Sequence, residues 1–93
     1  MTQFTIVVPT LNESENIDLL LTRLFALDIP SEKFEIIVVD DGSTDGTPDK
    51  VRAWEKRAQV HLIERKDTPD LTASILTGVA AAHSDVIVVM DAD

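Results

Sequence analysis

The chain has 93 residues, enough for one small domain with a modest core. Its 17 acidic and 8 basic residues give a net charge of −9, which argues against nucleic acid as a partner. There is no cysteine, so a disulfide framework and a thiolate metal site are excluded, and a cytoplasmic location is compatible. The longest apolar runs, such as Val86–Met90, are too short to span a bilayer, and Met1–Gln3 has no basic signal-peptide segment.

Four apolar segments rich in β-branched residues are predicted to be strands. The run Ile36–Val39 shows no polar alternation, which is typical of a parallel strand covered on both faces. The predicted strands are Phe4–Val8, Phe34–Val39, Val60–Glu64 and Val86–Met90.

A leucine-rich amphipathic pattern follows the first strand and predicts a helix that ends at about Leu27. Asn12 is the predicted N-cap of this helix, and Glu15 three residues later completes a capping box. The leucine stripe of the helix is expected to face the core.

Two further helices are predicted between the remaining strands. Thr47 followed by Pro48 indicates an N-cap with proline at the first helical position, and that helix extends to about Ala58. Trp54 on its apolar face is expected in the core. The third helix is expected over Leu71–His83.

The alternation β-α-β-α-β-α-β predicts an α/β fold: one domain over residues 1–93 with a parallel, Rossmann-like sheet and helices on its faces. Parallel strands place all their carboxyl ends at one end of the sheet, where ligands of such folds bind. The segments expected to converge there are 9–12, 40–45, 65–70 and 91–93.

Asp91 and Asp93 follow the last predicted strand at i and i+2 spacing, so both carboxylates can face one small volume. Two carboxylates suit Mg²⁺ or Mn²⁺ bound together with a substrate phosphate. This pattern is also common by chance as two solvated carboxylates. Its position after a buried strand, at the same end of the sheet as Asp40 and Asp41, favours the metal-diphosphate interpretation.

Asp40 and Asp41 end the second strand and open a turn with two glycines. Ser43, Thr44 or Asp45 are sufficient to cap the turn and the following helix. One of the two adjacent carboxylates is therefore free to accept a hydrogen bond from a base N–H or a ribose hydroxyl.

The remaining polar candidates each have two interpretations. Asn12 and Glu13 are either ordinary residues at a helix N-terminus or part of a site. Arg65, with the neighbouring Lys66, either approaches a phosphate or is a solvated loop cation. His61 and His83 have no spacing that indicates a shared function, and both are expected to be structural or surface residues.

Three segments in the same order resemble family 2 glycosyltransferases of the GT-A fold, namely Val8–Ile17, Ile37–Thr47 (IVVDDGSTDGT) and Val88–Asp93 (VVMDAD). Within that family the chain is most similar to polyprenol (dolichol)-phosphate mannosyltransferases. The resemblance implies an inverting, Mg²⁺- or Mn²⁺-dependent enzyme. Such an enzyme transfers mannose or another hexose from GDP-mannose or a UDP-sugar to a lipid phosphate.

The resemblance also assigns roles to individual residues. It places Pro9, Asn12 and Glu13 around the base, and Asp40 and Asp41 beside the nucleoside. It places Arg65 at the start of the third loop, and Asp91 and Asp93 at the metal and the sugar-diphosphate. Leu11 stands where the family usually has an aromatic residue, so a ring contact to the base is lost. Residues 70–73 stand where a glycine-containing stretch is usual.

Family members continue well past the D-x-D motif, so the chain is expected to be the N-terminal, donor-binding half. It then has no catalytic base or acceptor pocket of its own and should not turn over alone. The intact protein is expected in the cytoplasm or at the cytoplasmic face of a membrane. An oligomer through an unprotected fourth strand is a further expectation.

Two rival functions are weighed against this one. A phosphotransferase or phosphatase would use Asp91 as a covalent nucleophile, but such enzymes need further catalytic residues downstream. A non-catalytic nucleotide-binding or regulatory module would bind nucleotide without regard to metal or to Asp93.

Overall fold

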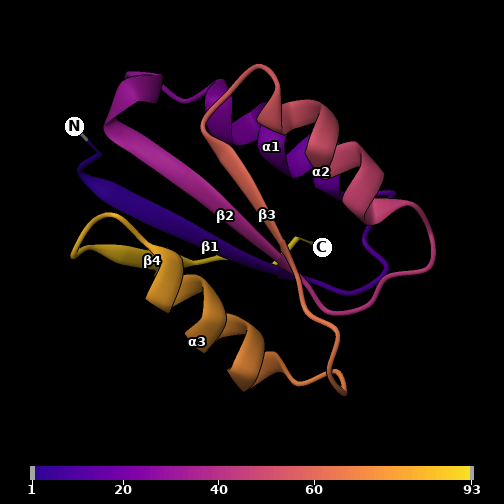
Figure 1. The fold of residues 1–93 in the computed structure, drawn as a ribbon. Coiled ribbons are helices and arrows are strands. Elements are labelled where there is room, and N and C mark those ends of the chain that lie inside the picture. The colour runs from indigo at the N-terminus through magenta and orange to yellow at the C-terminus, as the bar shows by residue number, and fades with distance from the viewer. Residues whose placement is uncertain (1, 93) are drawn as a thin grey trace.

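The computed structural model describes residues 2–92, which form a four-stranded, wholly parallel sheet with the strand order β3-β2-β1-β4 (Figure 1). The predicted α/β fold class is therefore confirmed. The strands are β1 (Phe4–Thr10), β2 (Phe34–Asp40), β3 (Val60–Glu64) and β4 (Ile87–Val89). The helices are α1 (Ile17–Phe25), the short 3₁₀ helix η1 (Ser31–Lys33), α2 (Thr47–Glu55) and α3 (Leu71–Ala81).

The register of the sheet brings the strand ends together. Thr10 pairs with Asp40, and Asp40 pairs in turn with Glu64. Three loops therefore leave the sheet side by side at what we call its carboxyl end. Every residue of β2 is buried, which agrees with the continuous apolar run predicted to lie between two helical layers.

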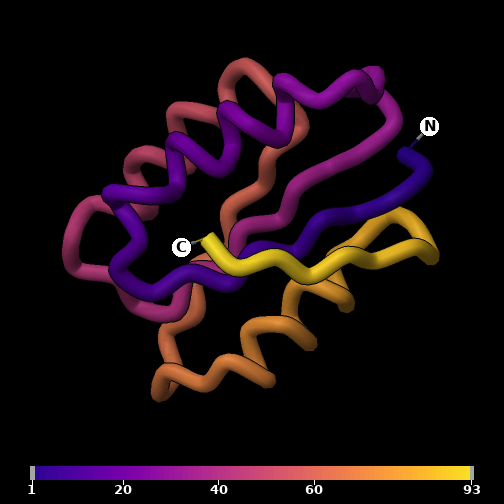
Figure 2. Tube along the Cα trace, turned by 180° about the vertical axis from the view of Figure 1, so that it is seen from behind, coloured from indigo at the N-terminus to yellow at the C-terminus, as the bar shows by residue number. Residues whose placement is uncertain are grey.

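The helices cover the two faces of the sheet unequally. Figures 1 and 2 show α1 and α2 on one face and α3 alone on the other. Because successive side chains of a strand point to opposite faces of the sheet, the strands contribute to two separate hydrophobic cores. The larger, under α1 and α2, contains Ile6, Val8, Ile17, Leu21, Leu24, Phe34, Ile36, Val38, Val51, Trp54, Val60 and Ala92. The smaller contains Val7, Ile37 and Val39, with Ile63, Ala81, Ala82 and Ile87 packed against it.

Helix α3 approaches the sheet closely because Gly78 has no side chain. A Cβ at Gly78 would lie 2.5 Å from Cγ1 of Val7 and 3.2 Å from Cγ2 of Val39. Glycine lowers helix propensity, so the sequence alone gave no reason for it here. The close packing of α3 on β1 and β2 supplies that reason.

The predicted start of the first helix is wrong. Asn12 has φ +56, in the left-handed region, and α1 begins only at Ile17 with Asn16 at the N-cap. The capping box of Asn12 and Glu15 therefore does not form. The Asn12 side chain instead accepts a hydrogen bond from the backbone N–H of Thr44, 32 residues away.

The other element boundaries differ by a few residues. Helix α2 has Gly46 at its N-cap, and Thr47 is its first residue. The predicted core positions Leu21, Leu24 and Trp54 are buried, whereas Leu27 lies beyond the end of α1 and is half exposed. None of the helices formed by residues 2–92 is long and apolar enough to cross a membrane.

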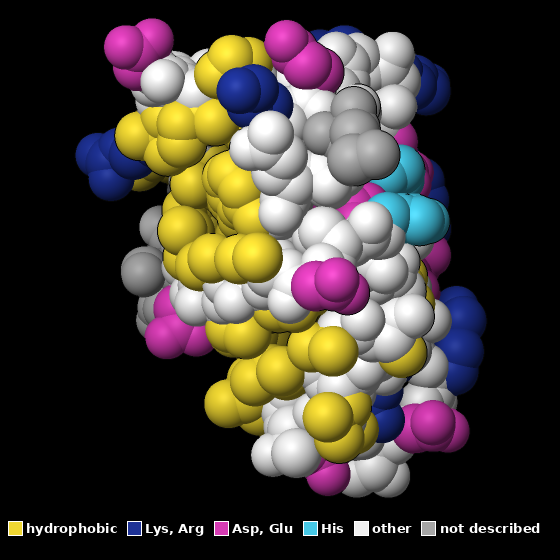
Figure 3. Space-filling model, turned by 90° about the vertical axis from the view of Figure 1, so that its left-hand side faces the viewer, with side chains coloured by type: hydrophobic (Ala, Val, Ile, Leu, Met, Phe, Trp, Pro, Cys, Tyr) yellow, Lys and Arg dark blue, Asp and Glu magenta, His cyan; other side chains and the backbone are white. Residues whose placement is uncertain are grey.

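Strand β4 lies at an edge of the sheet, as predicted, and pairs with β1 through Ile87–Val89. Figure 3 shows hydrophobic side chains gathered in patches on one side of the molecule. In the β4 segment, Val86, Val88 and Val89 are exposed. Association of two copies through this edge stays a prediction, which analytical ultracentrifugation would test.

Candidate functional site

Two loops at the carboxyl end of the sheet are joined by side-chain to backbone hydrogen bonds. The loop after β1 donates three backbone N–H groups to the turn after β2: Asn12 to Oγ of Ser43, Glu13 to Oγ1 of Thr47, and Ser14 to Oδ2 of Asp45, at 2.8, 3.0 and 3.0 Å. The Asn12 amide oxygen accepts from the turn in return. The serine, threonine and aspartate residues of the turn therefore hold a second loop as well as their own helix.

Asp40 is the buried anchor of the turn. Its Oδ1 accepts from the hydroxyls of Thr10 and Ser43 at 2.7 and 2.6 Å, and its Oδ2 accepts from the backbone N–H of Ser43 at 2.9 Å and of Gly42 at 3.3 Å. Four donors occupy this one carboxylate. Its main role is to fix the turn, a role that the sequence assigned to its neighbours.

Asp45 shares the capping role, as predicted. Its Oδ1 accepts from the backbone N–H and the hydroxyl of Thr47, and its Oδ2 accepts from Ser14. The hydrogen bonds from Thr47 are the largest influence on the pKa of Asp45. Together with those from Ser14, they hold it well below its ordinary value.

Asp41 forms an almost fully buried ion pair with Arg65, in which Nη1 donates to Oδ1, while the side chain of Arg65 is 11% exposed. The backbone N–H of Asp70 donates to Oδ2 of Asp41 at 2.7 Å. Arg65 is therefore not the solvated loop cation that was one of its two interpretations. Since the pair links the ends of β2 and β3 to the start of α3, it fixes the third loop.

The surroundings of Asp41 keep its carboxylate ionised. Burial is the largest influence and by itself raises the pKa of Asp41, but the hydrogen bond from Asp70 and the charge of Arg65 outweigh it. Ser74 acts in the same direction, since its hydroxyl lies near the carboxylate, although not in hydrogen-bonding geometry. The net result is a pKa below the ordinary value of an aspartate.

Two hollows adjoin Asp41. One has a volume of about 250 Å³ and is lined by Pro9, Thr10, Leu11, Asp41, Pro69, Asp70, Leu71 and Ser74. The other, of about 380 Å³, is lined by residues of the turn and the third loop, Asp40 to Ser43 and Glu64 to Asp67, together with Pro69. We call the first the Asp41–Ser74 pocket.

Ser74 is the buried polar side chain within residues 2–92 that has no hydrogen-bond partner at its side-chain oxygen. The residue is 1% exposed and lies on the sheet-facing side of α3. A buried hydroxyl without a partner costs about 1–3 kcal/mol of folding free energy. No sequence pattern singled out Ser74, because its isolation depends on which strands lie under the helix.

Asp91, two residues past the end of β4, is exposed and lines a separate hollow of about 200 Å³ against α1, together with Asn16 and Arg23. Asp93 lies outside the described residues. Among residues 2–92, no group of three or more histidine, cysteine and acidic side chains is arranged to hold a metal ion. A magnesium site built from one or two carboxylates and substrate phosphate does not require such a group.

The predicted site residues therefore fall into three sets. Asp41 and Pro9 share the Asp41–Ser74 pocket, and Arg65 is paired with Asp41. Asn12 and Glu13 lie in the loop that the turn holds. Asp91 lies at the same end of the sheet but opens toward α1 and not into that pocket.

A second polar cluster lies at the opposite, amino end of the sheet. Glu35 is 2% exposed and accepts from the Thr5 hydroxyl and the His83 backbone N–H, both at 2.7 Å, while Nδ1 of His83 lies 2.8 Å from its other oxygen. His61 Nε2 lies 3.8 Å from the same oxygen. Both histidines are thus exposed, structural residues, as predicted.

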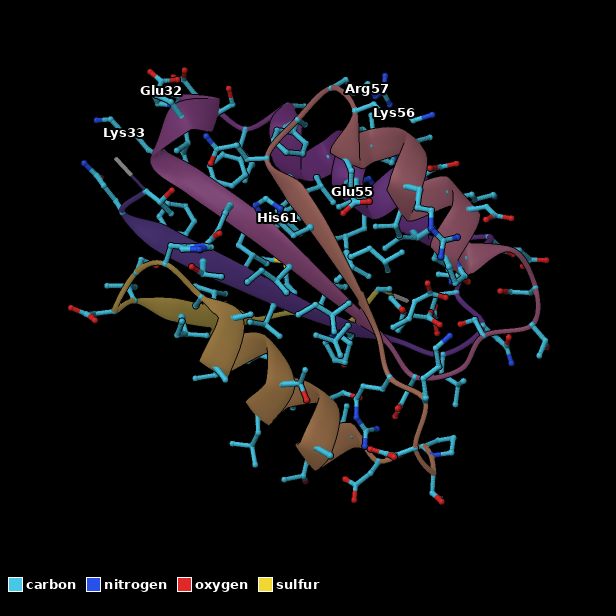
Figure 4. The ribbon with its side chains drawn as sticks, viewed as in Figure 1. Glu32, Lys33, Glu55, Lys56, Arg57 and His61 are labelled. Atoms are coloured by element: carbon cyan, nitrogen blue, oxygen red, sulfur yellow. The ribbon has the colours of Figure 1, made fainter. Side chains whose placement is uncertain are left out.

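Figure 4 shows His61 on β3 at this amino end, below charged side chains that η1 and the end of α2 turn outward. These labelled side chains are Glu32, Lys33, Lys56 and Arg57. The guanidinium of Arg57 lies over the ring of Trp54, 4.0 Å from its centroid, in a cation–π contact at the margin of the larger core.

The parallel sheet with alternating helices, the paired loops and the acidic turn form an α/β fold of the GT-A glycosyltransferase type. The sequence model of Glycosyl transferase family 2 matches residues 5–93, and the chain belongs to this family. The dolichol-phosphate mannosyltransferase of Pyrococcus furiosus is 36% identical over 96% of this chain and 25% of its own length.

Two solved structures extend the comparison. The mannosyltransferase PcManGT from Pyrobaculum calidifontis, in complex with GDP-Man and Mn²⁺, superposes with a TM-score of 0.90 and 34% identity over 98% of this chain and 27% of its own. S. aureus TarS 1-349 in complex with UDP gives a TM-score of 0.91 and 28% identity over 99% of this chain and 28% of its own. The chain therefore spans about a quarter of the length of each of these relatives.

Proposed function

We propose that this chain is the donor-binding part of a glycosyltransferase that moves a hexose, with mannose as the first candidate, from a nucleotide-diphosphate sugar to a polyprenyl-phosphate acceptor. The observation that carries the proposal is the buried Asp41–Arg65 pair, which joins the turn after β2 to the third loop and is flanked by two open hollows. The relative named as a dolichol-phosphate mannosyltransferase and the structure that contains GDP-Man support mannose.

The role proposed for each residue follows from its position and from the hydrogen-bonding atoms that protein partners leave unoccupied. Pro9 is a wall of the Asp41–Ser74 pocket, where Asp41 accepts from the nucleoside. Asn12 and Glu13 shape the loop that closes over the base. Asp40 contributes by fixing the turn, because its own acceptor positions are occupied by protein donors.

Arg65 holds Asp41 in its ionised form and fixes the third loop beside the nucleotide. An ionised carboxylate accepts hydrogen bonds from N–H or O–H groups but donates none, so it selects a nucleoside that presents donors. This preorganised geometry means that the site need not be assembled when the donor binds.

Asp91 and Asp93 would hold Mg²⁺ or Mn²⁺ together with the donor diphosphate. The exposed carboxylate of Asp91 fits this role, since it is a hard oxygen donor at the carboxyl end of the sheet. The bound cation would neutralise the charge of the departing nucleoside diphosphate. The presence of Mn²⁺ in the PcManGT structure supports this cofactor.

In the intact protein, an oxygen of the lipid phosphate would attack C1 of the sugar from the side opposite the leaving diphosphate, which inverts the configuration at C1. We assign no catalytic residue for this step. A polyprenyl-phosphate acceptor would place the intact protein at the cytoplasmic face of a membrane.

Calorimetric titration of the chain with GDP-mannose, GDP, UDP-glucose and UDP, with and without Mn²⁺, tests the proposal. We expect binding that depends on Mn²⁺ and is abolished in an Asp91→Ala/Asp93→Ala variant. Asp85→Ala is the matched control, because Asp85 is an exposed aspartate at the other end of the β4 segment. Circular dichroism confirms that each variant is folded.

The result also separates the rival functions. Binding that is indifferent to Mn²⁺ and to Asp93 would replace the transferase with a nucleotide-binding module. Covalent phosphorylation of Asp91 would favour the phosphotransferase. No binding by a folded wild-type chain would refute a self-sufficient donor site.

A further inference from the structure

A proline ends the pairing of β1 with β4. Every second residue of β1 turns its backbone N–H toward β4, beginning with Thr5, which donates to the carbonyl just before β4 at 2.8 Å. The next positions of this series are Val7 and Pro9, and proline has no N–H to donate. The N–H of Met90 still donates to the carbonyl of Val7 at 3.0 Å, but the chain described beyond Met90 makes no backbone hydrogen bond to β1. The segment that carries Asp91 is therefore not held by the sheet.

Ala92 provides the attachment that the sheet does not. It is 8% exposed and belongs to the larger core together with Ile17 and Leu21 of α1. Asp91, the residue before it, is exposed. An apolar side chain two residues beyond the last hydrogen bond to β1 is thus buried in the core, while the carboxylate between them remains in solvent.

Tight packing does not explain the alanine at this position. Its side chain is a single methyl group, which contributes little to the stability of the core. The neighbouring hollow of about 200 Å³, lined by Leu19 and Leu20 among others, leaves room for a larger apolar residue. What the burial of Ala92 does fix is the path of the backbone at Asp91.

We propose that Ala92 is a positioning residue of the metal and diphosphate site. The proposed ligands Asp91 and Asp93 precede and follow it in the sequence. With Ala92 in the core, the carboxylate of Asp91 is in place before the cation and the donor bind. This inference rests on the proposed function and adds to it the residue that preorganises the site. A released segment has to be ordered on binding, so the apparent affinity falls in proportion to the fraction of chains in which it is ordered.

The test measures the affinity for Mn²⁺ in the presence of GDP, with free Mn²⁺ followed by electron paramagnetic resonance. Ala92→Asn replaces the methyl group with an amide, which an apolar core cannot hydrogen-bond. Ala92→Val is the conservative variant, because it keeps an apolar side chain and the hollow has room for it. Urea denaturation of each protein is the second readout.

Ala82→Asn is the matched control. Ala82 also has an extended backbone, directly after α3, and it packs against the smaller core. The same substitution therefore disturbs a core contact away from Asp91. We expect Ala82→Asn to lose stability in urea but to bind Mn²⁺ as the wild type does.

We expect Ala92→Asn to bind Mn²⁺ at least about 10-fold more weakly than the wild type, because the cost of burying an amide without a partner exceeds that of a tenfold shift. Ala92→Val should keep the affinity of the wild type. Ala92→Ser is a milder change that should show a smaller loss in the same direction, and it carries the test if Ala92→Asn does not fold.

The inference and the proposed function fail on different results. If Ala92→Asn loses stability alone and binds Mn²⁺ as the wild type does, Ala92 has only a structural role, while the proposed donor site stands. Equal losses of affinity in Ala92→Asn and Ala82→Asn, or in Ala92→Asn and Ala92→Val, would also refute the inference. If a folded wild-type chain binds no Mn²⁺ with either GDP or UDP, the metal site fails and the inference fails with it.

Discussion

The two ends of the sheet each bury a carboxylate, but the groups that compensate its charge differ. At the amino end, Glu35 accepts hydrogen bonds from the Thr5 hydroxyl and the backbone N–H of His83, and its other oxygen lies 2.8 Å from the ring nitrogen Nδ1 of the exposed His83. At the carboxyl end, Asp41 is paired with Arg65, yet it borders two hollows and an unpartnered hydroxyl. Burial and ionisation alone therefore do not identify a site. At the carboxyl end, three loops also meet at the buried pair, and this convergence supports a site there.

The largest effect on stability is expected from Arg65→Ala, which removes the buried ion pair at the carboxyl end of the sheet. Since the ion pair is almost fully buried, its loss leaves Asp41 as an uncompensated buried charge, and we expect the free energy of unfolding to fall by about 3 kcal/mol. Urea denaturation at pH 7 measures it.

Arg52→Ala is the control for that experiment, because Arg52 also pairs with carboxylates, Asp49 and Glu64, but its side chain is 46% exposed. Its removal should cost less than about 1 kcal/mol. Equal losses in the two variants would show that the buried pair does not stabilise the carboxyl end of the sheet more than a surface pair does.

The next largest effect is expected from Glu35→Ala at the amino end. The variant leaves the Thr5 hydroxyl and the His83 N–H without their acceptor, and we expect a loss of about 2–3 kcal/mol in unfolding free energy. Nucleotide affinity of the folded protein should not change. Glu32→Ala, at an exposed position nearby, should change neither quantity, and a changed nucleotide affinity in Glu35→Ala would contradict the separation of the two ends.

The two buried carboxylates are also expected to make the stability of the protein depend on pH. Burial, the largest influence, raises the pKa of Glu35, but its hydrogen bonds with His83 and Thr5 outweigh it, so the net shift is downward, as for Asp41. A lowered native pKa means that the unfolded chain binds more protons in the acid range. The stability from both groups is therefore fully present above the ordinary carboxyl pKa of about 4 and is lost as pH falls through the native values.

Denaturation midpoints measured between pH 7 and pH 3 should therefore decrease in the wild type. The decrease should be smaller in Glu35→Gln, which cannot titrate at this position. An equally steep decrease in both proteins would show that Glu35 does not contribute to acid sensitivity.

The smallest effect is expected at Asn12. Asn12→Ala loses the hydrogen bond from Thr44 and places a Cβ-bearing residue without a polar side chain at φ +56, so a loss of about 1–2 kcal/mol is expected. Asn12→Gly loses only the hydrogen bond and should cost about 1 kcal/mol or less. If the glycine variant is the less stable of the two in thermal denaturation, backbone strain is not what selects asparagine here.

Most of the fold was predictable because it depends on local patterns. The run Ile36–Val39 specifies a strand covered on both faces, and the alternation of strands with helices specifies a parallel sheet whose ends converge. The same topology gathered Pro9, Asp41 and Arg65 at one end of the sheet. The helix start at Asn12 failed because Thr44, distant in the sequence, competes for its side chain.

The sequence by itself determined the class of fold, the family and the end of the sheet where a site can lie, since these follow from hydrophobic periodicity and from motifs contiguous in the chain. Tertiary structure alone decided how the polar groups are used. It assigned Asp40 to the turn, paired Asp41 with Arg65, enclosed Glu35 with His83 and left Ser74 without a partner. Hydrogen-bond partners across a sheet are set by strand order and register, which bring together residues that are far apart in the sequence.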